Sequence, residues 1–406
     1  MSKVTILQVV PRLDAGGSEQ TTLEIAQALA RAGARALVAT EGGRMATAIE
    51  RCGGEILPLP VAAKNPLTLL ANARALARLI EERGVDLVHA RSRAPAWSAL
   101  RAARATGRPF VTTYHGAYGK PGPLKALYNS VMGRGDRVIA NSEYTASLIA
   151  ARHPEAGTRT RVIYRGVDSA VFDPAGVPAE RVARLREQWG VQPGTRIVLQ
   201  AGRLSGIKGQ RQTIEAAQRL ARDKKLDDAV VILAGDDAPG KAGYRRELVD
   251  LVASSGLAGK VRLVGHCSDM PAAFLASHVA LMPSLVPETF GRASVEAQAM
   301  GCPVIVSDLG ALPETIVAGS ASAEFTGWLV PSKDPGALAD AIGLALTLSP
   351  SERAAIGERG RARVAARFTL SRLQQATLAV YDELIGSQLA RQFNRGVPLT
   401  EPPTST

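Results

Sequence analysis

Two glutamates, Glu288 and Glu296, stand eight positions apart where the chain changes from loop to helix. Pro287 and Gly291 suit a loop, whereas residues 292–300 favour a helix. A carboxylate near a helix N-terminus can accept hydrogen bonds from both hydroxyls of a vicinal diol such as a ribose, and the N-terminus itself attracts phosphate. The spacing alone leaves a second interpretation open, in which a surface loop precedes a helix with a capping glutamate.

Two basic residues, Arg203 and Lys208, lie in a glycine-containing loop between a predicted strand at 196–202 and a predicted helix at 210–222. Phosphate oxygens in proteins are commonly bound by N–H groups at a helix N-terminus together with nearby cations. The loop therefore predicts a phosphate-binding site. An exposed basic loop without a ligand is the alternative.

Short apolar runs alternate with amphipathic helical segments, beginning with a strand at 3–10, a turn that contains Gly16 and Gly17, and a helix at 19–32. Such alternation is typical of a parallel sheet that helices cover on both faces. The turn lacks the G-x-G-x-x-G pattern, so a dinucleotide-binding site has little support. Because the alternation begins again after a linker at 172–194, the sequence predicts two Rossmann-like halves.

The composition excludes several classes of protein. The chain has 406 residues, 46% of them hydrophobic and 21% charged, which suffices for two globular domains. Its three cysteines are far apart and odd in number, so neither a disulfide framework nor a zinc site is indicated. No apolar run approaches the roughly 20 residues of a membrane span, and the first residues suit a strand better than a signal peptide. We therefore expect a cytoplasmic protein.

The net charge of +12 favours anionic partners. Aromatic residues make up only 4% of the chain and the basic residues are scattered, so we expect no nucleic acid partner. Residues 1–180 carry 23 Lys and Arg against 15 Asp and Glu, and the stretch 120–137 combines basic with apolar residues. That stretch could lie on an anionic membrane surface or form a core-facing helix with a solvated back, and both interpretations stay open.

The stretch PETFGRASVEAQAMGCPVIVSD at 287–308 and the segment GRLSGIKG at 202–209 resemble signature motifs of one enzyme family. They are similar to those of the group 1 (family 4) retaining glycosyltransferases, in particular the bacterial envelope and lipopolysaccharide type. The resemblance covers nearly the whole chain. It implies the GT-B fold, an α/β architecture in which two Rossmann-like domains with parallel sheets face a cleft.

The resemblance also implies a division of the chain. An N-terminal acceptor-binding domain is expected over 1–175 and a C-terminal nucleotide-sugar donor-binding domain over 190–367. A helix over 368–388 would cross back to the first domain. The tail 391–406 is rich in Pro, Thr and Ser, and we expect it to be disordered.

Single residues acquire roles from the same resemblance. Glu288 would contact the transferred sugar, and Glu296 would bind the ribose. Arg203 and Lys208 would neutralise the leaving diphosphate, as a metal ion does in other glycosyltransferases. His115, at the end of a predicted strand, would orient a sugar, which makes it a candidate catalytic residue beside Glu288, Arg203 and Lys208. Further candidate donor-binding residues are Gly16, Gly17, Phe290, Gly291, Arg292 and Ala293.

The expected function is a metal-independent, retaining transfer of a sugar from a nucleotide-diphosphate donor to a hydroxyl acceptor. The expected pathway is the synthesis of lipopolysaccharide core or another envelope glycan, with a lipid-linked or saccharide acceptor. The resemblance implies neither cofactor nor metal, and a peripheral position on the inner face of the cytoplasmic membrane is compatible with it. UDP, GDP and ADP sugars stay open as donors. The alternatives are a soluble small-molecule acceptor and a non-catalytic sugar-nucleotide-binding protein.

Overall fold

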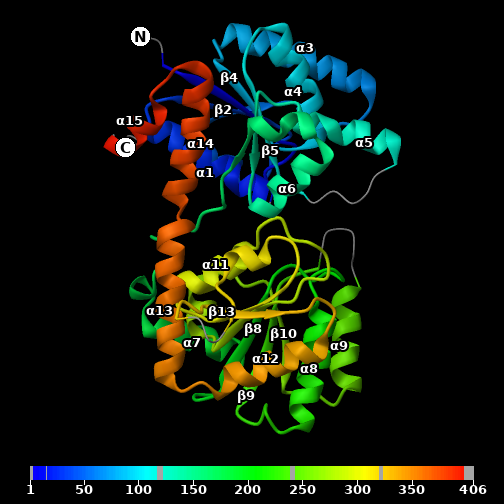
Figure 1. Cartoon of the computed structure of the whole chain (residues 1–406), viewed down its shortest axis with the longest axis vertical. Coiled ribbons are helices and arrows are strands. Elements are labelled where there is room, and N and C mark those ends of the chain that lie inside the picture. Colours follow the sequence, from blue (N-terminus) through cyan, green and yellow to red (C-terminus); the bar gives the residue numbers. More distant parts are fainter. Residues whose placement is uncertain (1–2, 15, 117–121, 238–242, 320–322, 397–406) are drawn as a thin grey trace, which may run out of the picture. The chain divides into compact units, whose positions relative to one another are not determined.

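The computed structural model divides the chain into two compact units (Figure 1). Unit 1 comprises residues 1–164 and 370–406, and unit 2 comprises residues 165–369. Each unit contains one parallel β-sheet with helices packed on it, so the predicted α/β class is confirmed. The residues that the structure describes are 3–14, 16–116, 122–237, 243–319 and 323–396.

The sheet of unit 1 has seven parallel strands in the order β3-β2-β1-β4-β5-β6-β7. Its three central strands, β1, β4 and β5, are buried at every residue, because helices cover both faces of the sheet. Ile6 and Leu7 of β1, for example, pack into separate hydrophobic clusters on opposite faces. The strands are β1 (Thr5–Val9), β2 (Arg35–Thr40), β3 (Glu55–Pro58), β4 (Leu87–Ala90), β5 (Phe110–Tyr114), β6 (Arg137–Ala140) and β7 (Thr160–Val162).

Two helices from the end of the chain belong to unit 1. Helix α14 packs on α1, and the side chain of Gln374 donates to the Glu24 carbonyl oxygen at 2.7 Å. Leu378 and Tyr381 of α14 are completely buried in the same hydrophobic cluster as Ile6. The helices of unit 1 are α1 (Gly17–Arg31), α2 (Ala46–Arg51), α3 (Pro66–Glu82), α4 (Arg93–Ala105), α5 (Pro123–Ser130), α6 (Glu143–Arg152), α14 (Leu370–Ile385) and α15 (Leu389–Arg395).

Helix α15 corrects the prediction of a disordered tail over 391–406. Residues 391–395 are helical, and Phe393 is buried against unit 1 with the guanidinium of Arg31 4.5 Å from the centre of its ring. The carboxylate of Asp382 accepts hydrogen bonds from the N–H groups at the start of this helix. Phe393 anchors this segment to unit 1 together with Leu389, which is buried one turn earlier in the same helix. The rest of the predicted tail, 397–406, lies outside the described residues.

The sheet of unit 2 has six parallel strands in the order β10-β9-β8-β11-β12-β13. The edge strand β13 was not predicted, because it has only four residues and follows a long irregular segment. The strands are β8 (Arg196–Ala201), β9 (Ala229–Ala234), β10 (Val261–Gly265), β11 (Val279–Met282), β12 (Val304–Ser307) and β13 (Gly327–Val330). The helices are α7 (Ala179–Gln188), α8 (Gln210–Arg222), α9 (Tyr244–Ser254), α10 (Met270–Ala276), α11 (Arg292–Ala299), α12 (Pro335–Thr347) and α13 (Pro350–Arg367).

The chain enters and leaves unit 2 through two paired segments. The N–H of Val167 donates to the carbonyl oxygen of Phe368 at 2.8 Å. Unit 2 begins at residue 165, ten residues before the predicted end of the first domain, because the segment up to β8 packs on unit 2. Leu185 and Trp189 of that segment are buried in a core cluster of unit 2, and Arg181 of α7 forms a bidentate ion pair with Asp269.

Candidate functional site

Two loops at the carboxyl ends of neighbouring strands bring predicted site residues together in unit 2. The β8–α8 loop carries Arg203 and Lys208, and the β11–α11 loop carries Glu288. Gly209, the N-cap of α8, has a φ of 77°, and a Cβ added there would lie 1.9 Å from the carbonyl oxygen of Pro283. Only glycine allows this approach, so the two loops pack backbone against backbone.

The predicted phosphate and sugar residues are in direct contact. The ammonium group of Lys208 lies 2.5 Å from Oε1 of Glu288. The hydroxyl of Ser284 donates a hydrogen bond to the same oxygen at 2.5 Å. The side chains of Lys208 and Glu288 are 33% and 22% exposed, whereas Ser284 is buried. Sequence reasoning missed Ser284, because a serine in a loop is too common to indicate a role.

The backbone of Glu288 is fixed by the segment that follows β12. The N–H of Ala311 donates to the Glu288 carbonyl oxygen at 2.9 Å. Gly310 has a φ of 67°, and a Cβ added to it would lie 2.4 Å from that carbonyl oxygen. The position of Glu288 therefore depends on a backbone contact that accepts no side chain at residue 310.

Glu296 lies in the second turn of α11, on the same loop–helix unit as Glu288. Nε of Arg292 donates to Oε1 of Glu296 at 3.3 Å, and the two side chains are 26% and 16% exposed. Gly291 is the N-cap of this helix, with a φ of 103°. Phe290 is buried, with its ring 5.7 Å from that of Phe368, so at this point only the backbone of the loop is available to a ligand.

Two buried glutamines that sequence reasoning missed support the β8–α8 loop. Nε2 of Gln200 donates to the Lys208 carbonyl oxygen at 2.7 Å, and Nε2 of Gln210 donates to the Arg203 carbonyl oxygen at 3.2 Å. The guanidinium of Arg203 itself is exposed and forms no ion pair with the described residues. Gln200 could have been found from the sequence, since a glutamine inside an apolar strand needs buried partners.

The predicted residues of unit 1 lie at the carboxyl end of its sheet. Gly16 is the N-cap of α1 and Gly17 is its first residue; both are exposed. A Cβ added to Gly17 would meet no atom within 4 Å, so the packing of unit 1 does not itself require glycine there. His115 directly follows β5 and is partly buried. The roles of these three residues toward donor or acceptor stay predictions.

A buried polar network occupies the carboxyl ends of β1, β4 and β5 in unit 1. The hydroxyl of Tyr381 lies 2.6 Å from Nδ1 of His89, and Nε2 of His89 lies 2.7 Å from the hydroxyl of Thr113. Nη2 of Arg91 donates to Oε1 of Gln8 at 2.6 Å and lies 3.4 Å from Nδ1 of His89. These contacts link strands β1, β4 and β5 to Tyr381 of α14.

This network places an arginine in the interior of unit 1. Burial lowers the pKa of Arg91, and the nearby Tyr381 and Glu24 oppose that shift. Burial likewise raises the pKa of Tyr381 to about 12. The Tyr381–His89 contact joins residues 292 positions apart, and sequence reasoning did not anticipate it. These ionisable groups therefore hold α14 on the sheet of unit 1.

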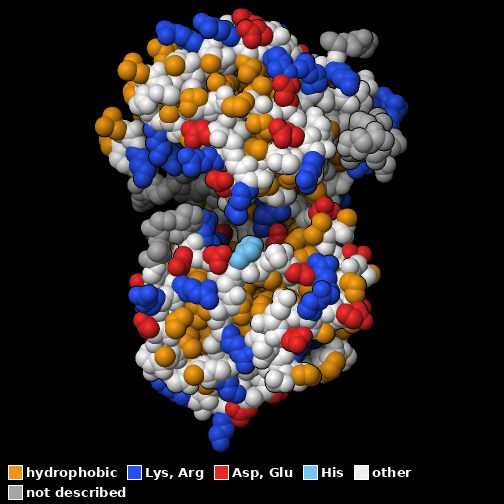
Figure 2. All heavy atoms as spheres, turned by 180° about the vertical axis from the view of Figure 1, so that it is seen from behind, with side chains coloured by type: hydrophobic (Ala, Val, Ile, Leu, Met, Phe, Trp, Pro, Cys, Tyr) orange, Lys and Arg blue, Asp and Glu red, His pale blue; other side chains and the backbone are white. Residues whose placement is uncertain are grey.

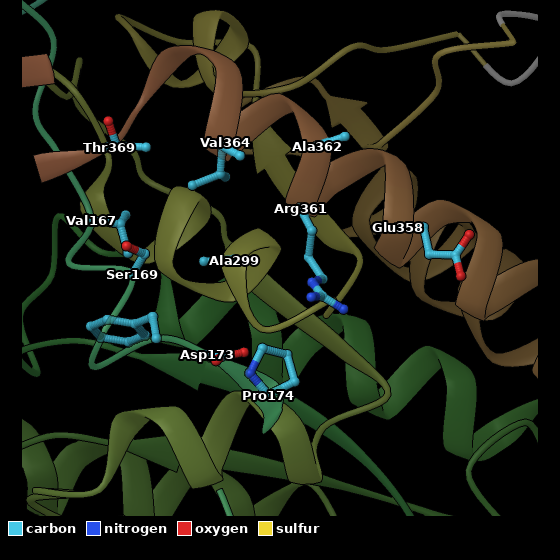
Figure 3. Close-up of a pocket in the computed structure, with 12 residues that line it drawn as sticks. Val167, Ser169, Asp173, Pro174, Ala299, Glu358, Arg361, Ala362, Val364 and Thr369 are labelled. Carbon is cyan, nitrogen blue, oxygen red and sulfur yellow. The ribbon is translucent and has the colours of Figure 1, made fainter. Parts of the chain in front are cut away.

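A cavity of about 550 Å³ lies elsewhere in unit 2, at the carboxyl end of α11 (Figure 3). Ala299 of α11, Val364 of α13 and Val167 form apolar parts of its wall, and Arg361 extends into it from α13. Glu296 lies in the middle of this helix, and its N-cap, Gly291, lies at the opposite end. None of the predicted site residues lines the cavity, so it is distinct from the cluster around Glu288.

The described part of the chain contains no group of three or more His, Cys, Asp or Glu side chains arranged to hold a metal ion. None of its helices combines the length and the apolar composition that crossing a membrane requires.

Comparison with known proteins identifies relatives over nearly the whole chain. Residues 15–171 match the model of the family Glycosyltransferase Family 4, and residues 182–363 match Glycosyl transferases group 1. A D-inositol 3-phosphate glycosyltransferase of Mycobacterium tuberculosis is 31% identical over 277 residues, which are 68% of this chain. The match covers 54% of that relative, so the chain spans about half the length of the curated relatives it matches.

Solved structures agree with the family models. A glycosyltransferase from Rickettsia africae superposes with a TM-score of 0.86 and 30% identity, covering 96% of this chain and 100% of the other. HepE of Anabaena, solved in complex with UDP-glucose, has a TM-score of 0.80 and 24% identity over 94% of this chain and 100% of its own, a likeness of fold alone. The chain therefore belongs to the group 1 glycosyltransferases, and it is a transferase enzyme with the GT-B fold.

Proposed function

We propose that this glycosyltransferase moves a sugar from a nucleotide-diphosphate donor to a hydroxyl acceptor, with retention of the anomeric configuration and without a metal ion. The observation that carries the proposal is the contact between Lys208, Glu288 and Ser284 at the meeting of two loops in unit 2. It supplies one cation and one carboxylate beside the N-terminus of α8. Diphosphates bind such cations and helix N-termini, and carboxylates accept hydrogen bonds from sugar hydroxyls.

The proposed roles follow the charges that the reaction develops. Breaking the bond between the anomeric carbon and the diphosphate oxygen leaves negative charge on the diphosphate and positive charge on the sugar ring. Arg203, Lys208 and the N–H groups of α8 would stabilise the diphosphate. Glu288 would hold the sugar and favour the positive ring. Glu296 would accept hydrogen bonds from the ribose hydroxyls, for which its present contact with Arg292 has to open or be shared.

For the acceptor, we propose an envelope glycan or its lipid-linked precursor, bound by unit 1 with Gly16, Gly17 and His115 near the reacting groups. The first 180 residues carry the excess of positive charge noted above. Figure 2 shows Lys and Arg side chains spread over one face of this unit, with hydrophobic side chains among them. A surface of this kind attracts anionic lipid headgroups and phosphorylated saccharides.

Helix α5 supports a membrane contact at this unit. Leu124 and Leu127 are 84% and 57% exposed, and Lys125 lies beside them on the same helix. The apolar residues of the stretch 120–137 do not all lie on the surface, because Val131 is buried in the core. Lys120 of that stretch lies outside the described residues. Exposed leucines next to a basic residue fit the boundary between lipid headgroups and acyl chains.

A second candidate acceptor is a soluble phosphorylated cyclitol or sugar. The M. tuberculosis relative is named for D-inositol 3-phosphate, and the same basic surface of unit 1 would suit a soluble phosphate. The two candidates share the donor half of the reaction. They differ in whether the acceptor is presented by a membrane.

A panel assay tests the proposal. The purified protein is incubated with UDP, GDP or ADP sugars, each with lipid-extract, saccharide or inositol-phosphate acceptors, in excess EDTA. We expect one donor class to give a product whose mass adds one sugar and whose NMR couplings show the donor's anomeric configuration. Inversion of configuration or loss of activity in EDTA would overturn the retaining or the metal-independent part. No transfer from any of the donors would overturn the whole proposal.

Liposome flotation separates the two acceptor candidates. Binding that needs anionic lipid, weakens with salt and falls in the Lys125→Glu, Arg134→Glu double variant supports a membrane-borne acceptor. The matched control reverses two exposed cations of unit 2, Arg222 and Lys224, and should leave flotation unchanged. If wild type stays in solution with anionic liposomes at low salt, the soluble acceptor becomes the proposal.

A further inference from the structure

We propose that Ser284 is the residue that positions the Glu288 carboxylate for sugar transfer, an inference that rests on the function proposed for Glu288. The Ser284 hydroxyl lies 2.5 Å from Oε1 of Glu288, and Ser284 is only 2% exposed. A carboxylate can only accept, so the single hydroxyl proton of Ser284 is committed to Glu288. Hydrogen bonds to an ionised partner are among the strong ones in proteins.

Ser284 and Lys208 contact the same oxygen of Glu288, and we expect Lys208 to give up this contact when the donor binds. Lys208 and Ser284 both contact Oε1 of Glu288, whereas Oε2 has no hydrogen bond with the described residues. When the donor's diphosphate binds, it competes with Glu288 for the ammonium group of Lys208. Ser284 is then the donor that keeps Oε1 in place, and Oε2 remains open to the sugar hydroxyls.

The two donors differ in how firmly the chain holds them. Lys208 reaches Glu288 through a four-carbon flexible stem. Ser284 has a short side chain on a backbone that is tied on both sides. Its carbonyl oxygen accepts from the Ser332 hydroxyl at 3.1 Å, and the next N–H, of Leu285, donates to the Ile207 carbonyl oxygen at 2.9 Å. Ser284 is thus built to stay while Lys208 is free to follow the phosphate.

This arrangement predicts a specific kinetic signature. Ser284 is a positioning residue that acts through Glu288, so its removal should lower kcat and leave the KM for the sugar nucleotide within about twofold. Ser284→Ala should reduce kcat roughly tenfold, the effect of losing one hydrogen bond to a charged group. Ser277→Ala is the matched control, because Ser277 is equally buried in unit 2 but donates only to the Ala273 carbonyl oxygen.

The decisive experiment is a double-mutant cycle of Ser284→Ala and Glu288→Gln, measured as kcat with the donor that the panel assay selects. If Ser284 acts through Glu288, its removal should have little further effect once Glu288 is replaced. A tenfold loss that persists in the Glu288→Gln background, or wild-type kcat in Ser284→Ala, would overturn the inference. Wild-type turnover in Glu288→Gln alone would instead overturn the proposed function.

A second experiment does not require the sugar nucleotide. The same cycle is measured on the thermal unfolding midpoint of the ligand-free protein, with Ser277→Ala in place of Ser284→Ala as the control. The midpoint shifts of Ser284→Ala and Glu288→Gln should be less than additive, because Glu288→Gln removes the charge that strengthens the same hydrogen bond that Ser284→Ala deletes. Strict additivity would show that the hydroxyl does not hold Glu288, whatever the donor turns out to be.

Discussion

Polar and charged side chains lie at the carboxyl ends of both parallel sheets, but those of unit 1 are buried and those of unit 2 are partly exposed. In unit 1, His89 and Arg91 are buried and Tyr381 of α14 lies against them. In unit 2, Lys208 and Glu288 stay 33% and 22% exposed. A buried charge has to find its partners inside the fold, whereas a partly exposed pair can exchange its partner for a ligand. The exposed fraction of the side chains therefore distinguishes the buried network of unit 1 from the proposed ligand site of unit 2.

One pair of residues makes the comparison concrete. Gln8 of β1 and Gln200 of β8 stand near the ends of corresponding strands, each between the two halves of its sheet. Nε2 of Gln8 donates to the carbonyl oxygen of Thr22 in α1, and its Oε1 accepts from Arg91. Nε2 of Gln200 instead donates to the Lys208 carbonyl oxygen. The same side chain supports a helix in unit 1 and, in unit 2, the loop that we propose to bind the diphosphate.

The largest expected effect is on stability and concerns the buried polar network of unit 1. Arg91→Ala should lower the free energy of unfolding by about 3–5 kcal/mol, because it removes a fully buried side chain and leaves Oε1 of the buried Gln8 without its donor. Chemical denaturation measures the loss. Arg203→Ala, which removes an exposed guanidinium from unit 2, should stay within about 0.5 kcal/mol of wild type. Equal destabilisation in the two variants would contradict the comparison.

The second prediction concerns activity and the partly exposed pair of Lys208 and Glu288 in unit 2. Lys208→Ala should lower kcat/KM, because it removes a cation from the negative charge that develops on the diphosphate. The expected loss corresponds to about 2–4 kcal/mol of transition-state stabilisation. Its unfolding midpoint should change little, because the ion pair it loses is partly exposed. Steady-state kinetics with excess EDTA throughout provides the test, and Lys225→Ala is the control. Full activity in Lys208→Ala would remove Lys208 from the site.

A smaller effect is expected at the ribose. Glu296→Ala should raise the Kd for the free nucleoside diphosphate roughly tenfold, as the loss of hydrogen bonds to a charged group predicts. Because these contacts exist in ground and transition states alike, kcat at saturating donor should be nearly unchanged. Isothermal titration calorimetry measures the affinity, with Glu358→Ala on α13 as the control. Unchanged affinity in Glu296→Ala would rule out the ribose assignment.

The smallest effect compares buried histidines in the two units. Burial lowers the pKa of His153 in unit 1 and of His278 in unit 2, and the cations Arg196 and Arg353 add to the shift at His278. As the pH falls below about 6.5, the unfolded chain takes up these protons first, so stability decreases between pH 6.5 and the lower folded pKa. Above pH 6.5 both histidines are neutral in either state and contribute no slope.

His278→Gln tests this slope, because its amide can still donate to the Ala345 carbonyl oxygen that Nε2 of His278 contacts at 3.0 Å. Between pH 7.5 and 5.5 the unfolding midpoint of wild type should fall by roughly 2 °C more than that of the variant. Parallel pH profiles would show that His278 does not titrate differently on folding.

The sequence predicted the repeating architecture well and the contacts between distant segments poorly. The apolar periodicity located α8 at 210–222, because a 13-residue amphipathic pattern is a strong local signal. Strand β13 has only four residues and α15 only seven, so neither is long enough to show a clear periodic pattern. Local patterns do not reveal which later segment covers an earlier one, and for that reason the Tyr381–His89 contact was missed.

The candidate site likewise contains residues that the sequence predicted and residues that it did not. Lys208 and Glu288 were identified because their flanking residues form recognisable motifs, and the structure brings them to 2.5 Å of each other. Ser284 and Gln200 were missed, since their importance lies in what they touch, not in a spacing. His115, Gly16 and Gly17 are placed by the structure at the carboxyl end of the sheet of unit 1, and their roles remain predictions.

The return of the chain to unit 1 at residue 370 has a consequence for synthesis on the ribosome. Unit 2 is one continuous segment, 165–369, and all of its strands are available before α14 is translated. Unit 1 must wait, because Tyr381 and α15 are among the last described residues to leave the ribosome. Unit 1, whose synthesis begins first, is therefore completed after unit 2. A chain cut short before residue 370 would expose His89 and Arg91, a defect that cellular quality control can recognise.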